Sequence, residues 1–161
     1  MIEASKTDLI ELGMGQAADL SSLHAKAFPR EEAWSQRDIV DLLQLDTTTC
    51  FGLRVHDALV SFVIAQVAVD QAEILTIVTS PKHQQQGYAR QVLDRSEPYF
   101  QAKGAENWLL DVAEDNQGAR AFYEKLGFAE DGRRPQYYKR LEGGRVDAIL
   151  MSRPMGGQGT S

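Results

Sequence analysis

The stretch that most constrains the fold of this chain runs from Ile74 to Tyr88 and reads ILTIVTSPKHQQQGY. It begins with apolar and β-branched residues, which are typical of a buried strand. A proline and a short polar loop follow, and a glycine then leads directly into an amphipathic segment. A strand, a glycine loop and a helix N-terminus in this order predict an anion-binding site, because free backbone N–H groups and the helix dipole point to one place.

Length and charge narrow the class of protein. A chain of 161 residues can bury one self-sufficient core, and we expect a single domain over 1–153 followed by a glycine-rich, disordered tail at 154–161. The net charge of −6 argues against a nucleic-acid-binding surface. Cys50 is the only cysteine, and the sequence has no signal-like or membrane-spanning run. We therefore expect a cytoplasmic protein without a disulfide or a membrane partner.

Hydrophobic periodicity predicts the elements around this stretch. Two helices come early, the first at 16–28 and the second capped by Ser35 with Asp38 three residues on. Strands at 50–55, 59–69 and 73–78 are joined by short turns, which predicts three antiparallel neighbours. Apolar residues at nearly every position of 62–69 indicate a strand covered on both faces. A helix at 87–103, a strand at 107–112, a short helix capped by Asn116, and strands from 128 and at 146–151 complete the order.

Two motifs resemble the signatures of the GNAT N-acetyltransferases. Residues 84–89, QQQGYA, match Gln/Arg-x-x-Gly-x-Gly/Ala, and Asn116 followed by AFYEKLGF at 121–128 resembles the second signature. The resemblance covers about 7–153. It implies an α/β (α+β) GNAT fold, in which about four helices flank a mixed, mostly antiparallel, twisted sheet of six to seven strands.

Within that superfamily the chain resembles the RimI-type ribosomal-protein-alanine N-acetyltransferases. The resemblance rests on AFP at 27–29, WS at 34–35, GRR at 132–134, YY at 137–138 and DAILM at 147–151. The chain departs from that group by the insertion of 30–33, by Asp111 in place of a glutamate, and by one extra residue before the tyrosine pair. The resemblance implies direct transfer of acetyl from acetyl-CoA, in a ternary complex, to the N-terminal α-amino group of a ribosomal protein that begins with alanine. The alternatives are a GNAT enzyme for a small amine or lysine side chain, and a non-catalytic acyl-CoA sensor.

The same resemblance assigns the acetyl-CoA site. Backbone N–H groups of the glycine loop would face the pyrophosphate, the backbone at the end of the preceding strand would pair with pantetheine, and an asparagine would contact the cofactor arm. The residues at these positions are Gln84, Gln85, Gln86, Gly87, Tyr88 and Ala89 in the loop, Ile77, Val78 and Thr79 in the strand, and Asn116.

Two residues occupy the family's catalytic positions. Asp111 stands on an otherwise apolar strand, where an unpaired carboxylate is costly, and it is the candidate proton acceptor. A satisfied structural aspartate is the alternative, and Glu114 is the rival base. Tyr123 is the candidate proton donor to the departing thiolate. Its alternative role is core packing beside Phe122.

Acceptor binding is predicted from aromatic residues on either side of the motifs. Phe28, Trp34, Tyr137 and Tyr138 are candidates for a peptide groove, with core packing as the alternative. Glu31, Glu32 and Asp38 would attract a basic peptide or else form a solvated surface. The scattered histidines and the lone cysteine show no metal-ligand spacing, so no metal is expected. The sequence leaves a monomer or a weak dimer open.

Overall fold

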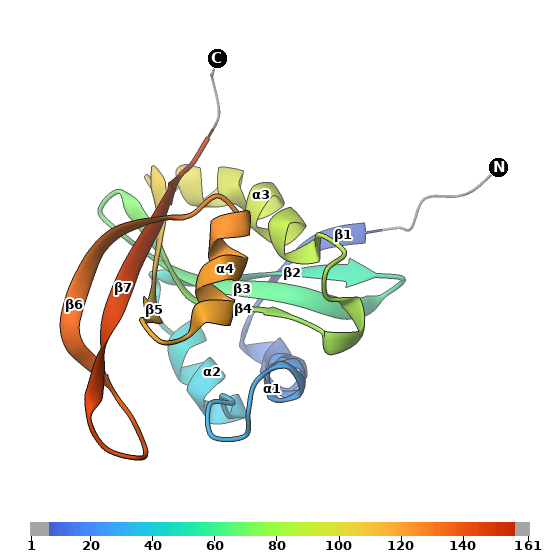
Figure 1. Cartoon of the computed structure of the whole chain (residues 1–161). Helices are drawn as coiled ribbons and strands as arrows, with labels where there is room; N and C mark the ends of the chain where they lie inside the picture. The colour runs from blue at the N-terminus through green and yellow to red at the C-terminus, as the bar shows by residue number, and fades with distance from the viewer. Residues whose placement is uncertain (1–6, 157–161) are drawn as a thin grey trace.

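A computed structural model describes residues 7–156, which form one seven-stranded sheet with four α-helices packed on it (Figure 1). The strands are β1 (Thr7–Leu12), β2 (Thr48–Val55), β3 (Ala58–Ala68), β4 (Gln71–Thr79), β5 (Asn107–Ala113), β6 (Ala129–Lys139) and β7 (Arg145–Pro154). The helices are α1 (Ala17–Ala27), α2 (Gln36–Leu43), α3 (Tyr88–Gln101) and α4 (Gln117–Lys125), with 3₁₀ turns η1 (Met14–Gln16) and η2 (Pro81–His83). The predicted α/β fold with a mixed sheet is confirmed.

The strands lie in the order β1-β2-β3-β4-β5-β7-β6. All neighbours are antiparallel except β4 and β5, which are parallel. The predicted run of three antiparallel strands is therefore confirmed as β2, β3 and β4. His56 and Asp57 connect the first two with φ values of 51° and 68°, the left-handed backbone that a tight hairpin turn needs.

The helices cover both faces of the sheet, and each face has its own apolar layer. On one face the predicted stripe of α3 is buried against the fully buried Trp108 of β5, and α4 packs at the same layer. On the other face α1 and α2 pack on β2, β3 and β4 around Cys50, Phe62 and Ile64. The stripe residues are Ala89, Val92, Leu93 and Phe100. The sheet thus separates an α3–α4 side from an α1–α2 side.

Both predicted helix caps are present. Ser35 Oγ accepts from the Asp38 N–H at 3.0 Å, and Asp38 Oδ2 accepts from the Ser35 N–H at 2.9 Å, which completes the capping box of α2. The Asn116 side chain accepts from the Ala119 N–H at 3.1 Å and caps α4. These polar contacts fix where the chain enters the two helices beside the candidate site.

The strand predicted from 128 is β6. It continues through the polar, basic stretch from Gly132, and its backbone pairs with β7 although its side chains are largely exposed. Two predictions about individual segments are wrong. Full burial of β3 ends at Ala65, and Val69 is 93% exposed in a turn, because the strand extends past the helices that cover it. Phe122, placed on the buried face of α4, is 41% exposed because it faces a cleft.

The prediction that a disordered tail begins at residue 154 is wrong. Pro154 ends β7, the Met155 N–H donates to the Glu106 carbonyl at 2.9 Å, and the Gly156 N–H donates to Glu97 Oε2 at 2.7 Å. Residues 154–156 are therefore held against α3 and the turn that follows it. The rest of that predicted tail, 157–161, lies outside the described residues.

Candidate active site

The glycine loop joins β4 to α3 and leaves the helix N-terminus open. Gln85 and Gly87 both have left-handed backbone, with φ of 64° and 83°, and Gly87 is the N-cap of α3. No side chain caps this helix, so the first N–H groups of α3 have no intrahelical acceptor and no capping partner. A Cβ on Gly87 would meet no atom within 4 Å, which leaves space in front of the loop. This is the geometry that a phosphate needs.

β4 and β5 diverge beside this loop. The two parallel strands pair only at Gln71 with Asn107, Ala72 with Trp108 and Glu73 with Leu109. Beyond Glu73, β4 continues to Thr79 with no β5 partner, and the backbone groups of Ile77–Thr79 on that side are free to bind an extended ligand. The V-shaped opening lies between the two apolar layers.

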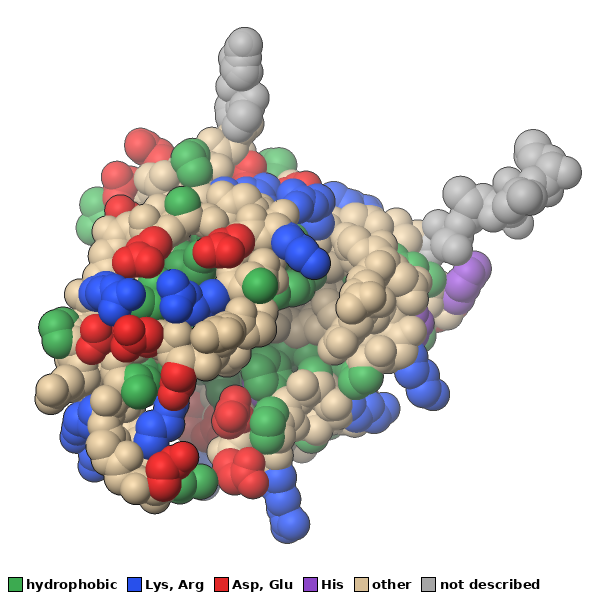
Figure 2. Space-filling model, in the orientation of Figure 1, with side chains coloured by type: hydrophobic (Ala, Val, Ile, Leu, Met, Phe, Trp, Pro, Cys, Tyr) green, Lys and Arg blue, Asp and Glu red, His purple; other side chains and the backbone are tan. Residues whose placement is uncertain are grey.

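A cleft of about 940 Å³ runs from the loop to this opening. Figure 2 shows the molecule hollowed near the centre of this face, with hydrophobic side chains exposed in the hollow. The predicted residues that line the cleft are Phe28, Ile77, Val78, Thr79, Gln84, Gln85, Gly87, Tyr88, Ala89 and Tyr123. Those that do not line it are Trp34, Gln86, Asp111, Asn116, Tyr137 and Tyr138.

The cleft is basic although the whole chain carries a net charge of −6. Its charged or chargeable linings are His83 beside the loop, Arg90 in the first turn of α3 and Lys125 at the end of α4. The Arg90 guanidinium also donates to the Lys125 carbonyl, which ties the two helices together. No carboxylate lines the cleft among the described residues. The sequence motifs do not single out Arg90 or Lys125. Their signal in the sequence is their position, in the first turn of α3 and at the C-terminus of α4.

Tyr123 lies in the wall that α4 contributes to the cleft. Its ring packs edge-on against Phe128, with the ring centroids 5.8 Å apart. Burial raises the pKa of Tyr123 to about 12, so the phenol keeps its proton at neutral pH. Tyr123 is on the α3–α4 side of the sheet and packs at that apolar layer.

Asp111 lies on the opposite side of the opening. It alternates along β5 with the buried Leu110 and Val112, so its side chain points to the α1–α2 side. It stands two residues beyond Leu109, where β5 has already left β4. The Tyr138 hydroxyl donates a hydrogen bond to Asp111 Oδ1. The structure therefore brings together a predicted base and a predicted acceptor-binding residue that no sequence pattern pairs.

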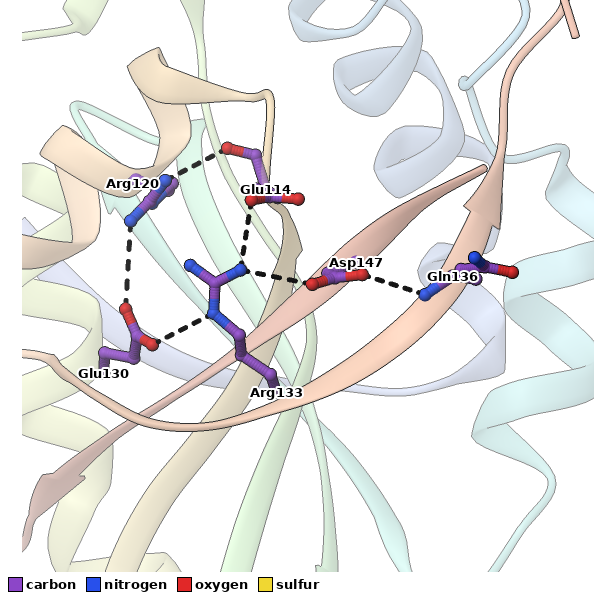
Figure 3. A network of polar contacts seen from close by, with 6 residues as sticks. All are labelled: Glu114, Arg120, Glu130, Arg133, Gln136 and Asp147. Atoms are coloured by element: carbon purple, nitrogen blue, oxygen red, sulfur yellow. Dashed lines mark hydrogen bonds and ion pairs between the residues drawn. The ribbon is translucent and has the colours of Figure 1, made fainter. Parts of the chain in front are cut away.

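Glu114, the rival base, is bound into an ion-pair network (Figure 3). Its Oε2 accepts from Arg133 Nη1 at 3.0 Å, and the same nitrogen donates to Asp147 Oδ2 at 3.2 Å. Its backbone carbonyl accepts from Arg120 Nη1 at 3.1 Å. The Glu114 carboxylate is therefore already engaged by the Arg133 guanidinium.

The aromatic residues near the mouth of the cleft are organised by His24. This buried histidine of α1 stacks on Phe28 and Trp34, with ring centroids 4.3 Å and 5.0 Å away. Its Nδ1 accepts from the Trp34 N–H at 3.1 Å, and its Nε2 lies 3.2 Å from Thr76 Oγ1. Desolvation by burial lowers the pKa of His24 to about 4. Of the two rings stacked on His24, Phe28 lines the cleft and Trp34 does not.

The remaining predicted acceptor residues are exposed. Tyr137, 48% exposed on β6, lies under the Arg134 guanidinium, whose central carbon is 5.4 Å from the ring centroid. Glu31 and Glu32 are exposed on the connection between α1 and α2. Asp38 is exposed too, but its carboxylate serves the cap of α2. These side chains remain available to an acceptor at the surface, without forming a closed pocket.

Residues 7–156 contain neither a metal-binding cluster nor a membrane-spanning helix. No group of three or more His, Cys, Asp or Glu side chains there is arranged to hold a metal ion. None of the helices in this part of the chain combines the length and the hydropathy needed to span a membrane.

Known proteins resemble the chain in sequence and structure. The model of the acetyltransferase (GNAT) family matches residues 17–128. The [ribosomal protein bS18]-alanine N-acetyltransferase of Escherichia coli K12 is 34% identical over 131 residues, or 81% of this chain and 84% of that protein. The enzyme of the same name from Haemophilus influenzae is 33% identical over 97 residues, or 60% of this chain and 66% of that protein.

Solved structures of N-acetyltransferases also resemble the chain. The crystal structure of the ribosomal-protein-S18-alanine N-acetyltransferase from Escherichia coli matches with a TM-score of 0.77 and 28% identity, covering 96% of this chain and 98% of that one. A chimera of the spermidine N-acetyltransferase SpeG from Vibrio cholerae and hSSAT matches with a TM-score of 0.73 and 24% identity, covering 93% of this chain and 96% of that one. The second likeness concerns the fold alone.

Proposed function

Because the chain belongs to the acetyltransferase (GNAT) family, we propose that it transfers acetyl from acetyl-CoA directly to an amine in a ternary complex. The preferred acceptor is the N-terminal α-amino group of a ribosomal protein that begins with alanine. The observation that carries the proposal is the opening between β4 and β5, which has the uncapped glycine loop at one end and Tyr123 and Asp111 on its two sides. The names of the relatives support the choice of acceptor.

The residues present fit acetyl-CoA. The N–H groups at the start of α3 would bind the pyrophosphate, and Arg90 and Lys125 supply positive charge without a competing carboxylate. The unpaired edge of β4 at Ile77–Thr79 would pair with the amides of pantetheine. The cofactor would thus enter from the α3–α4 side and present its thioester in the opening.

The two sides of the opening support separate chemical roles. The amine would approach from the α1–α2 side, where Asp111 would accept its proton, and attack the thioester carbonyl carbon. An α-amino group has a pKa of about 7.7–8.0, against about 10.4 for lysine, so this carboxylate site suits an N-terminus better than a lysine side chain.

Tyr123 would protonate the leaving sulfur from the other side. With a pKa of about 12, its phenol is a weak donor to a thiolate whose pKa is about 8.5. Tyr123 would therefore donate its proton to the sulfur only while it takes up a second proton. That second proton comes from the positively charged nitrogen of the tetrahedral intermediate. The net reaction releases one proton for each ammonium acetylated.

The acceptor is tested with purified protein, acetyl-CoA and four amines: a basic peptide that begins with alanine, the same peptide with a blocked N-terminus, an internal-lysine peptide and spermidine. We expect mass spectrometry to find acetyl on the α-amino group of the first peptide, formed faster than any product from the others. Equal rates on all four would refute the proposed acceptor. Binding of acetyl-CoA without turnover of any amine would favour a sensor.

The proposed donor is tested with Tyr123→Phe. The variant should lose about 10²–10⁴-fold in kcat and keep its affinity for acetyl-CoA, because only the phenolic proton is removed. Tyr99→Phe, which removes a phenolic hydroxyl from the exposed surface of α3, serves as the matched control. A Tyr123→Phe enzyme as fast as the control would exclude Tyr123 as the proton donor.

A further inference from the structure

The side chain of Asp111 is one methylene shorter than the glutamate of the enzymes that the chain resembles. It projects from β5 at the point where the sheet has opened. A carboxylate in this position needs either a water or another side chain to reach an amine bound in front of it. The structure contains a side chain in contact with it, the phenol of Tyr138.

Tyr138 reaches Asp111 because the β6–β7 hairpin curves over the end of β5. Asp111 pairs with Leu150 of β7, whereas Tyr138 pairs with Val146, four residues further along the same strand. Four residues of strand span about 13 Å, which is further than one tyrosine side chain extends. Figure 1 shows the curvature of this hairpin, which closes the gap.

A bulge in β6 sets the position of Tyr138. The register with β7 shifts between Arg134 and Tyr138, and Gln136 within it has left-handed backbone with φ of 52°. Asp147 of β7 holds this bulge: its Oδ1 accepts from the Gln136 N–H at 3.0 Å while its Oδ2 accepts from Arg133 (Figure 3). The network described above therefore anchors the bulge to the β5–α4 loop and to α4.

The ring of Tyr138 is held from its face as well. The central carbon of the Arg140 guanidinium lies 6.0 Å from the ring centroid, and Arg140 in turn pairs with Asp115, with its Nε 2.8 Å from Oδ2. Tyr138 is half-buried. Its hydroxyl is thus fixed against the Asp111 carboxylate.

The groups around Tyr138 keep its phenol protonated. Burial and the hydrogen bond to Asp111 raise its pKa far above the ordinary value, and nearby Tyr137 adds to the increase while the positive charge of Arg134 opposes it. A phenol of this kind does not act as a base on its own. It can accept one proton only while it passes its own proton to the carboxylate.

We propose that Tyr138 is a catalytic residue that relays the proton of the acceptor ammonium to Asp111. The inference rests on the proposed amine acetylation. The ammonium gives a proton to the phenol oxygen as the phenol gives its proton to the Asp111 carboxylate, and the neutral amine forms the C–N bond. The C–S bond then breaks, Tyr123 protonates the sulfur and regains a proton from the nitrogen, and Asp111 releases its proton to water.

The relay is tested by a double-mutant cycle between Tyr138→Phe and Asp111→Glu. Tyr138→Phe keeps the ring and its packing, so it should fold with the melting temperature of the wild type and lose about 10²-fold in kcat. Adding Asp111→Glu should restore most of that rate, because the longer side chain brings the carboxylate to the place of the lost hydroxyl. In the Asp111→Glu background, removal of the phenol should cost little.

Tyr99→Phe is again the matched control. If Tyr138→Phe raises KM for the acceptor and leaves kcat unchanged, Tyr138 only binds the acceptor and the relay is wrong. A double variant no faster than Tyr138→Phe also overturns it. Wild-type protein that acetylates no amine would refute both the proposed function and the relay, whereas an active wild type with an unaffected Tyr138→Phe refutes the relay alone.

Discussion

Acidification from pH 7.5 to 5.0 should lower the free energy of unfolding by about 2 kcal/mol through His24 alone. The ring of His24 is 1% exposed between Phe28 and Trp34. The Trp34 N–H donates to Nδ1, which leaves the single ring proton on Nε2, facing Thr76 Oγ1. A second ring proton would point at the Trp34 N–H and break that bond.

The sign and size of this loss in the free energy of unfolding follow from the shift in the pKa of His24. The pKa of His24 falls from 6.5 to about 4 on folding, because burial disfavours the charged ring. Below pH 6.5, His24 therefore binds a proton in the unfolded chain but stays neutral in the folded protein. Stability is lost as the pH falls toward 4. The difference of about 2.5 pKa units corresponds to about 3.4 kcal/mol in full, of which about 2 kcal/mol is expressed by pH 5.0.

Urea unfolding of the wild type and of His24→Gln at both pH values isolates this effect. Glutamine does not titrate, and its amide keeps a donor toward Thr76. The pKa values of Asp38 and Asp115 are lowered by their hydrogen-bond partners, so both carboxylates stay ionised at pH 5.0 in both proteins. The wild type should lose about 2 kcal/mol more than the variant. Equal losses would refute the assignment of a buried, neutral His24.

Three further changes test other parts of the molecule. Ser35→Ala removes the cap of α2 and should cost about 1 kcal/mol in chemical denaturation. Gly87→Ala puts a side chain on left-handed backbone, so it should cost about 1–2 kcal/mol, and calorimetry should show weaker binding of acetyl-CoA. Asp147→Ala frees the Gln136 N–H, so it should lower kcat at unchanged affinity for acetyl-CoA, as stopped-flow and binding assays can check. Because the partners of Asp147 are exposed, the loss of stability should not exceed about 1 kcal/mol.

The proposed donor half of the site could be predicted from the sequence because most of its parts are local. The strand, the glycine loop and α3 are consecutive, and α4 follows after β5; periodicity and caps predict each of these elements. The structure places eight of the nine loop and strand residues along the cleft. Gln86 is the exception, since its side chain turns back to the Lys82 carbonyl, 3.4 Å away.

The acceptor half could not be predicted in the same way because it depends on long-range curvature. The contact between Tyr138 and Asp111 needs a bulge and a bent hairpin, neither of which leaves a periodic signal in a strand whose side chains are mostly exposed. The burial of His24 likewise results from the path of the connection between α1 and α2, which brings Trp34 back over α1. The hydrogen-bond partners of polar residues depend on the tertiary fold, so they cannot be identified from local sequence.

The bulge in β6 has a consequence for how this protein behaves at high concentration. β6 is one of the two outer strands of the sheet, and an uninterrupted outer strand would offer its free backbone groups to the same strand of another molecule. Two register shifts, Pro135 and the charged side chains of Arg133, Arg134 and Lys139 interrupt that row. The irregularity that aims Tyr138 inward thus also protects the open margin of the sheet from filament-like self-association.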